Sequence, residues 1–283
     1  MSLPPSAGIF GWPVAHSKSP LIHRFWLEKL GMDGDYGRFP VEPEKLGDAI
    51  RALPALGLRG VNVTVPHKQA VIAHLDRIDP LAERIGAVNT VAVEAGMLVG
   101  YNSDAAGFLE PLRPLLNQNW LMRMARIIGT GGAALAVAHA LHGEGFITVI
   151  IGRDIEKAKA LRGGYEPDDS LVATLDSFRQ PSDFEWTDRS GVLDLVVNTT
   201  SLGMKGQPEL GLDFSHVPPG AVVYDIVYAP LETPLLAEAR TRGHATIDGL
   251  AMLIGQAAVA FEKFYGAAPP RDHDAELREL LTR

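Results

Sequence analysis

Residues 129–134 read GTGGAA, directly after RII (126–128), the end of a predicted strand, and at the start of a predicted helix over 132–142. The spacing fits G-x-G-x-x-A, in which the first glycine allows a tight bend and the second lets the backbone approach a pyrophosphate. The helix N-terminus would add N–H groups and the positive end of its dipole. With a predicted strand over 147–151, the stretch indicates a Rossmann-type dinucleotide-binding domain. The competing interpretation is a tight turn that binds nothing.

The end of the second strand decides between NAD and NADP. Folds that bind NAD usually carry Asp or Glu there, about 20 residues after the turn, to hold the ribose hydroxyls. Here Gly152 is followed by Arg153, and Lys157 lies one helical turn later. Two cations without an acid at the strand end favour the 2′-phosphate of NADP, and NAD stays possible because an ordinary surface ion pair would give the same pattern. Asp154 would repel that phosphate unless it caps the following helix and faces away.

Strand and helix patterns alternate along the rest of the chain. Before the turn we predict strands over 7–11, 36–41 and 60–65, helices over 20–30, 43–53, 68–75 and 80–86, and a hairpin over 88–100 that turns at Ala95-Gly96. Around and after it we predict helices over 105–116 and 248–264, the latter capped by Asp248, and strands over 193–198 and 221–228. Residues 163–190 give no clear pattern.

This alternation implies an α/β fold with mostly parallel sheets, and the chain of 283 residues is long enough for two domains. We predict an N-terminal α/β domain over residues 1–104, completed by C-terminal helices over 249–283. We predict a Rossmann-type, doubly wound domain over 105–248.

The composition argues against several classes of protein. The formal net charge is -8 and no long run of Lys or Arg occurs, which argues against nucleic acid or an anionic membrane as the main partner. The chain has no cysteine, and its histidines lack metal-ligand spacing, so we predict no metal site. No signal-peptide pattern and no apolar run of about 18 residues is present, and we expect a cytoplasmic protein.

The stretch VNVTVPHK (61–68) raises the question of a small polar ligand. Its valines alternate with Asn62 and Thr64, so a strand would send the valines to one face and the polar pair to the other. Pro66 would end the ladder, and Lys68 would follow at the start of a helix. Water and a polar ligand are both possible neighbours of these side chains.

Other polar residues lie at predicted strand or helix ends. Ser19 precedes Pro20 and is a natural N-cap, whereas Ser17 is not needed as a cap and points more specifically to a carboxylate ligand. Asn89 begins a strand, and Asp104 lies at the domain junction. Gln256 lies among apolar residues, where a buried amide needs a partner from the protein or from a ligand.

Several motifs together resemble the shikimate dehydrogenase family. They cover most of the chain in family order and read GWPVAHSKSPLIH (11–23), VNVTVPHK, GAVNT (86–90), YNSDAAGF (101–108), GTGGAA, NTTSLGM (198–204), YDIVYAPLETPLL (224–236) and DGLAMLIGQ (248–256). The resemblance implies NADP-dependent interconversion of 3-dehydroshikimate and shikimate in aromatic amino acid biosynthesis, in a cytoplasmic monomer or homodimer.

The resemblance also implies roles for individual residues. Lys68 and Asp104 would be the catalytic pair, with the lysine ammonium giving a proton to the carbonyl oxygen and Asp104 orienting it. Ser17 and Ser19 would hold the substrate carboxylate, and Thr64, Asn89, Tyr228 and Gln256 would hold its hydroxyls and carboxylate. The predicted cofactor-binding residues are Gly129, Thr130, Gly131, Gly132, Ala133, Gly152, Arg153, Lys157, Ile226 and Gly249.

Departures from the family pattern leave alternatives open. Ser103 replaces a threonine, Ala105 replaces a glycine, and Gly152-Arg153-Asp154 stands where the family has N-R-T. The alternatives are a quinate/shikimate dehydrogenase with NAD preference, a catalytically silent paralogue that binds ligand and regulates a partner, and a dehydrogenase of a shikimate analogue.

Overall fold

The computed structural model describes residues 4–164 and 171–283. The chain forms two compact units, which we call unit 1 (Met1–Gly107 with Ile254–Arg283) and unit 2 (Phe108–Leu253). Within the described residues, no helix combines the length and the apolar character needed to cross a membrane.

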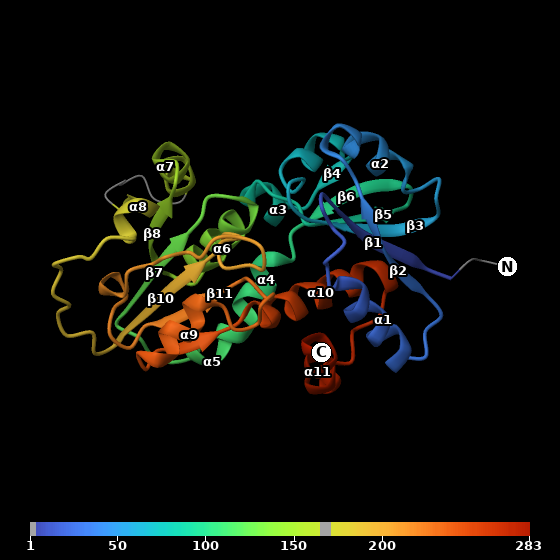
Figure 1. Ribbon diagram of the computed structural model, residues 1–283. Coiled ribbons are helices and arrows are strands. Elements are labelled where there is room, and N and C mark those ends of the chain that lie inside the picture. Colours follow the sequence, from blue (N-terminus) through green and yellow to red (C-terminus); the bar gives the residue numbers. More distant parts are fainter. Residues whose placement is uncertain (1–3, 165–170) are drawn as a thin grey trace. The chain divides into compact units, whose positions relative to one another are not determined.

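Unit 1 is built on one mixed sheet (Figure 1). Its strands are β1 (Ser6–Gly11), β2 (Asp35–Pro40), β3 (Leu58–Val63), β4 (Arg77–Ile78), β5 (Thr90–Glu94) and β6 (Met97–Tyr101), in the order β2-β1-β3-β5-β6-β4. β1 pairs parallel with β2 and β3, and β4 pairs parallel with β6. β5 runs antiparallel to β3 and β6. The predicted hairpin is confirmed, and its turn carries positive φ at Ala95 and Gly96, as a tight turn of this kind requires.

Helices lie on both faces of this sheet. They are α1 (Ser19–Lys29), η1 (Pro43–Lys45), α2 (Leu46–Ala52), η2 (Ala70–His74), α3 (Pro80–Ile85), η5 (Arg271–His273), α11 (Asp274–Thr282) and parts of α4 (Asp104–Leu109) and α10 (Gly249–Tyr265). Figure 1 shows α2 on one side of the sheet, with α1 and α10 on the other. Ile50 of α2 packs in a core with Val61 and Val63, while α1 and α10 pack aromatic rings against each other, among them Trp26 and Phe261.

Two local expectations in unit 1 are wrong. β3 ends at Val63, so Val65 does not share the buried valine face; Val61 and Val63 are at most 1% exposed but Val65 is 69% exposed. The chain leaves the sheet because residues 64–67 form a turn, closed by the His67 N–H donating to the Thr64 carbonyl. The helix expected over 68–75 is a short 3₁₀ helix, η2.

Unit 2 contains a fully parallel sheet. Its strands are β7 (Met122–Ile128), β8 (Ile147–Gly152), β9 (Val172–Thr174), β10 (Val192–Asn198), β11 (Val222–Asp225) and β12 (Ala245–Ile247). Its further helices are η3 (Glu110–Leu112), α5 (Arg113–Leu116), α6 (Gly132–Gly143), α7 (Ile155–Gly163), α8 (Leu175–Phe178), η4 (Phe214–His216) and α9 (Pro234–Thr241).

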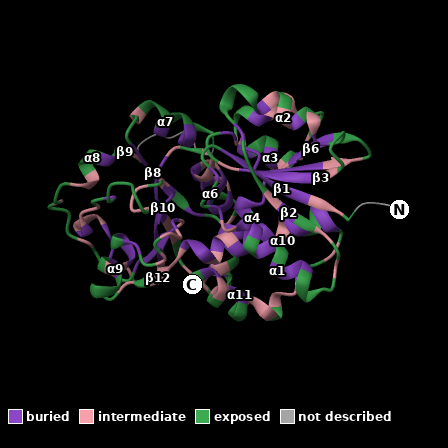
Figure 2. Cartoon of the chain, turned by 45° about the vertical axis from the view of Figure 1, so that its right-hand side comes forward, coloured by how far each residue is buried: buried purple, intermediate pink, exposed green. Residues whose placement is uncertain are grey.

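The strand order of unit 2 is β12-β11-β10-β7-β8-β9. Read from the other edge it is 3-2-1-4-5-6 in chain order, the order of a Rossmann fold. β8 and β10 are buried along most of their length (Figure 2), as expected for a sheet covered on both faces. The predicted fold class, α/β with a doubly wound dinucleotide-binding type of domain, is therefore confirmed.

Two local expectations around unit 2 differ from the structure. The predicted helix over 105–116 is three short helices, α4, η3 and α5, and the strand expected over 221–228 ends at Asp225. Of the unassigned stretch 163–190, residues 165–170 lie outside the described residues.

His23 is a fully buried, titratable residue in the core of unit 1. Its ring is fully buried and stacked on Tyr36 at 4.0 Å between centroids, and neither ring nitrogen has a hydrogen-bond partner among the described residues. Burial lowers the pKa of His23 from 6.5 to about 3, because the charged ring would have to leave water.

This burial predicts an acid-sensitive fold. Between pH 6.5 and about 3 the unfolded chain holds a proton on His23 that the folded chain lacks, so the free energy of unfolding should fall as the pH drops, by up to ~1.4 kcal/mol per pH unit. His23→Phe removes this titration and should flatten the pH dependence of urea unfolding in that window. The exposed His16→Gln is the control and should leave the slope as it is. Equal slopes for wild type and His23→Phe would contradict the prediction.

Candidate active site

A buried ion pair lies at the junction of two polar segments in unit 1. The Lys68 Nζ lies 2.5 Å from the Asp104 Oδ2, and the two side chains are 16% and 5% exposed. Asp104 is the first residue of α4. No other described residue hydrogen-bonds the Lys68 ammonium, which has three N–H groups. Two of these donors are therefore available to a ligand.

The backbone around Lys68 is fixed by local hydrogen bonds. The Lys68 carbonyl accepts from the Val88 N–H at 2.8 Å. The neighbouring His67 is buried, and its Nε2 lies 2.8 Å from the Val41 carbonyl oxygen, to which it donates. His67 is thus a structural residue. The lysine side chain extends from a turn whose two ends are held by the sheet.

Asn89 fixes the orientation of the Asp104 carboxylate. The Asn89 Oδ1 accepts from the backbone N–H of Ser103 at 2.8 Å, which only an oxygen can do. Its Nδ2 must therefore face the other way, where it donates to the Asp104 Oδ1 and to the Ser103 Oγ, each at 2.9 Å. Each oxygen of Asp104 has a different partner, Asn89 on one side and Lys68 on the other.

A second layer of buried polar groups supports Asn89. Asn62 donates to the Asn89 carbonyl at 3.2 Å and to the Thr90 Oγ1 at 3.0 Å, and it accepts from the Tyr36 hydroxyl at 2.7 Å. Thr90 in turn donates to the Asn89 Oδ1 at 3.1 Å. Asn62 is therefore a structural residue that binds neighbouring backbone and side chains, and neither water nor a ligand is needed to satisfy it.

Ser17 and Ser19 lie together at the start of α1, with their hydroxyl oxygens 3.3 Å apart. The expected N-cap role of Ser19 is wrong, because Ser19 is already helical and Lys18 occupies the cap position without a side-chain cap. Instead, the Ser17 Oγ accepts from the Ser19 N–H at 3.3 Å. The Arg38 guanidinium donates twice to the Ser17 carbonyl, at 2.9 and 2.6 Å, and thus holds the turn next to a positive charge.

The remaining predicted substrate residues differ in their surroundings. Thr64 is half-buried, and its hydroxyl has no hydrogen-bond partner among the described residues. The Gln256 Oε1 accepts from the Ser103 Oγ at 3.4 Å, which joins α10 to the polar network of unit 1. Gly107 of α4 permits this approach, because a Cβ there would lie 2.4 Å from the Gln256 backbone nitrogen. Tyr228 belongs to unit 2, where it follows the end of β11 and is half-buried.

The glycine turn of unit 2 has the geometry that a pyrophosphate site needs. Gly129 has a φ of +127°, and a Cβ on it would lie 2.3 Å from the Thr199 Oγ1, so no other residue fits there. Gly131 is the N-cap of α6, and Gly132 and Ala133 form its first turn, whose N–H groups lack partners within the helix. This end of α6 can receive an anion.

Two exposed cations lie at the end of β8, beside the glycine turn. Gly152 lies beside the turn, since a Cβ on it would be 2.8 Å from the Thr130 methyl carbon. Arg153 and Lys157 are exposed, and neither side chain has an ion-pair partner within residues 4–164 and 171–283. Asp154 caps α7, and its Oδ1 accepts from the N–H groups of Glu156 and Lys157 at 3.0 and 3.2 Å. The acid is engaged with the helix and leaves both cations available.

Ile226 and Gly249, predicted as cofactor residues, lie against each other. A Cβ on Gly249 would be 2.2 Å from the Ile226 carbonyl oxygen. Asp248 caps α10 as predicted, accepting from the Leu250 N–H at 3.0 Å.

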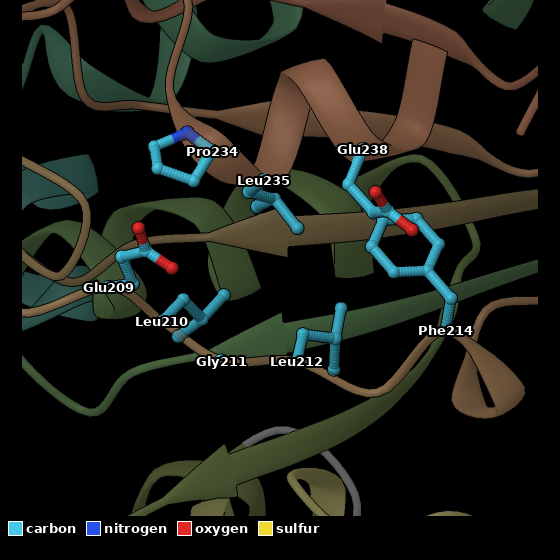
Figure 3. A pocket seen from close by; sticks show the side chains of 8 residues that line it. All are labelled: Glu209, Leu210, Gly211, Leu212, Phe214, Pro234, Leu235 and Glu238. Carbon is cyan, nitrogen blue, oxygen red and sulfur yellow. The ribbon is translucent and has the colours of Figure 1, made fainter. Parts of the chain in front are cut away.

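No group of metal-ligating side chains occurs within the described part of the chain. A pocket of about 250 Å³ lies in unit 2 between the residues before η4 and the start of α9. Figure 3 shows its apolar side chains, with a glutamate at either end. None of the predicted site residues lines it, so it is separate from the groups described above.

The sequence motifs contained four polar residues to which no role was given. They are Asn198, Thr199, Asp225 and Thr233, which lie at or just after the carboxyl ends of β10 and β11 or at the start of α9. The sequence did contain a signal for them, because two apolar strands end in polar residues. The carboxyl edge of a parallel sheet is where ligands bind.

A family model and the sequences of known proteins indicate the same family. Residues 9–91 match a family model described as the shikimate dehydrogenase substrate binding domain. A protein of Rhodospirillum rubrum named shikimate dehydrogenase (NADP(+)) is 48% identical over 273 residues, covering 94% of this chain and 93% of the relative.

Two solved structures match this chain over nearly its whole length. A shikimate dehydrogenase crystallised with NADP+ has a TM-score of 0.86 and 34% identity, covering 99% of this chain and 96% of that chain. Shikimate 5-dehydrogenase from Thermus thermophilus, crystallised with NADP(H) and shikimate, has a TM-score of 0.81 and 36% identity, covering 98% of this chain and 99% of that chain.

The network around Asn89 predicts a large effect on stability. Asn89→Ala leaves the Ser103 N–H and one oxygen of Asp104 buried without partners, so it should lower the free energy of unfolding by about 2–3 kcal/mol. The exposed Asn117→Ala should change it by less than about 0.5 kcal/mol. Urea unfolding of both variants measures the difference, and equal stability of the two would show that the network does not hold Asp104.

Proposed function

Because the chain belongs to the shikimate dehydrogenase family, we propose that it catalyses the reversible, NADP-dependent reduction of 3-dehydroshikimate to shikimate in aromatic amino acid biosynthesis. The observation that carries the proposal is the 2.5 Å contact between the Lys68 ammonium and the Asp104 carboxylate. The relatives described above are named as shikimate dehydrogenases. The Rossmann strand order of unit 2 supports the binding of NADP.

Each unit has a separate part in this proposal. Residues 1–104 with 249–283 act as the substrate-binding and catalytic domain, and residues 105–248 act as the NADP-binding domain. The family-model match over 9–91 supports the first assignment, and the strand order of unit 2 supports the second. Cytoplasmic location, and a monomeric or homodimeric state, stay predictions.

The substrate is held through its carboxylate and hydroxyls. Ser17 and Ser19 offer two hydroxyls at a helix start, and the neighbouring Arg38 adds positive charge. Thr64 offers a hydroxyl that binds no group in the described part of the chain, and Asn89, Tyr228 and Gln256 contribute amide and phenol groups. The two unused N–H groups of Lys68 point to a role at the carbonyl oxygen.

Lys68 supplies the proton in reduction. NADPH, when bound, would supply the hydride that the carbonyl carbon needs. As negative charge grows on the carbonyl oxygen, the Lys68 ammonium stabilises it and transfers a proton to it. Asp104 fixes where Nζ lies, because its Oδ2 accepts from the ammonium at 2.5 Å. In oxidation the neutral Lys68 amine accepts the hydroxyl proton as hydride leaves the carbon.

The NADP site uses the turn of unit 2 and the end of β8. Gly129, Thr130, Gly131, Gly132 and Ala133 would hold the pyrophosphate, with Gly152, Ile226 and Gly249 beside them. Arg153 and Lys157 would bind the 2′-phosphate. The capping role of Asp154 supports this assignment, because that carboxylate accepts helix N–H groups.

An assay with two substrates and two cofactors tests the function. We expect the purified protein to oxidise shikimate with NADP+ at a kcat/KM at least about tenfold above that with NAD+ or with quinate, because each alternative loses or misplaces a charged or hydrogen-bonded contact. The formation of reduced nicotinamide is followed by absorbance. Preference for quinate or NAD+ would select the quinate/NAD alternative, and binding of shikimate without turnover would select the silent paralogue.

Replacement of Lys68 tests the mechanism. Lys68→Ala should lower turnover by about a hundredfold or more with little effect on the KM for shikimate, because the proton donor acts mainly in the transition state. Lys45→Ala removes an exposed lysine of the same unit and should be as active as wild type. Near-normal turnover of Lys68→Ala would remove Lys68 from the mechanism.

A further inference from the structure

We infer that Asp225 is a positioning residue, whose buried carboxylate fixes the segment carrying Ile226 and Tyr228. The inference rests on the proposed function, which gives these two residues their contacts with cofactor and substrate. Asp225 itself touches neither and acts through the backbone that follows β11.

The Asp225 carboxylate gathers three donors from three segments of unit 2. Its Oδ1 accepts from the Val227 N–H and from the Asn198 Nδ2, each at 3.0 Å. Its Oδ2 accepts from the Thr233 hydroxyl at 2.7 Å. The side chain is fully buried. Residues 226–228 are thus tied through one carboxylate to the end of β10 and to the start of α9.

Each partner of Asp225 is itself held in place. Asn198 donates to the Leu202 carbonyl at 3.0 Å and accepts from the Thr200 N–H at 3.0 Å, and its own carbonyl accepts from the Ile226 N–H at 3.1 Å. Thr233 caps α9 by accepting from the Leu236 N–H at 3.3 Å. The helix that begins there presents Pro234 and Leu235 to the pocket of Figure 3.

Residues 226–227 have little room to move. A Cβ on Gly249 would lie 2.2 Å from the Ile226 carbonyl oxygen and 2.6 Å from the Val227 carbonyl oxygen. This backbone therefore lies between the Asp225 carboxylate and the Gly249 backbone. A small shift after loss of the carboxylate would displace both Ile226 and Tyr228.

The charge of Asp225 does not stabilise the fold. Burial is the largest cause that raises the pKa of Asp225, to about 6, and all three donors are neutral groups. Since the folded-state pKa lies above the ordinary 3.8, ionising this carboxyl between pH 3.8 and about 6 lowers the stability of the folded chain. What the ionised group contributes is two acceptor oxygens that reach three segments at once.

A matched pair of variants separates positioning from general stability. Asp225→Ala should raise the KM for shikimate and for NADP+ by about tenfold or more, and Asp225→Asn, which keeps one acceptor for the Val227 N–H, should raise them less. Asp194→Asn is the control: Asp194 is a buried carboxylate of β10 that binds Arg189 at 2.7 Å, so its loss should lower stability and leave both KM values within about twofold.

A conservative pair covers the case in which Asp225→Ala does not fold. Thr233→Ser keeps the hydroxyl and should leave both KM values within about twofold of wild type, whereas Thr233→Val should raise them severalfold. Unchanged KM values in Asp225→Asn and Thr233→Val, or equal increases in Asp194→Asn, would overturn the inference.

Hydrogen exchange provides a readout that does not depend on activity. The Val227 amide should exchange at least about tenfold faster in Asp225→Asn or Thr233→Val than in wild type, while amides of the central strand β7 should not change. If the wild type failed to oxidise shikimate, the proposed function would fall, and exchange at Val227 would still decide whether Asp225 fixes this segment. Unchanged Val227 exchange would overturn the inference even in an active enzyme.

Discussion

The buried ion pair of Lys68 and Asp104 is the constraint around which unit 1 is arranged. Removing two charges from water costs several kcal/mol per ion, so such a pair persists only when further hydrogen bonds complete it. Asn89 supplies one to the carboxylate, and Asn62 and Thr90 hold Asn89 in turn. Two strands, β3 and β5, and the start of α4 are thereby fixed relative to the lysine. The ammonium keeps two donors for a ligand.

Much of the fold could be predicted from the sequence because local chemistry decides it. GTGGAA between a strand and a helix indicated the Rossmann domain, Ala95-Gly96 the hairpin turn, and Asp248 a helix start, and the structure confirms each. The errors occurred at the ends of elements, where a turn or a cap moves the boundary by one or two residues. Val65 continues the alternation but belongs to a turn, and Ser19 precedes Pro20 but lies inside the helix because Lys18 takes the cap position.

The site could be predicted less completely. Motif spacing named Lys68 and Asp104, which the structure brings to 2.5 Å although they are far apart in sequence. It left open whether Asp154 would repel a phosphate, which depended on its contact with the α7 N–H groups. It gave no role to Asp225, because three partners spread over residues 198–233 cannot be paired from spacing alone. Residues that bind a ligand are visible in a motif, whereas those that hold them become visible only in the fold.

A double-mutant cycle on the ion pair tests the central claim most directly. The kcat for shikimate oxidation with NADP+ is measured for Lys68→Ala, Asp104→Asn and the double variant. If the two groups work as one unit, the double variant should be no slower than about the worse single variant, with a coupling free energy of about 2 kcal/mol or more. Additive losses, with each substitution lowering kcat independently of the other, would contradict the account.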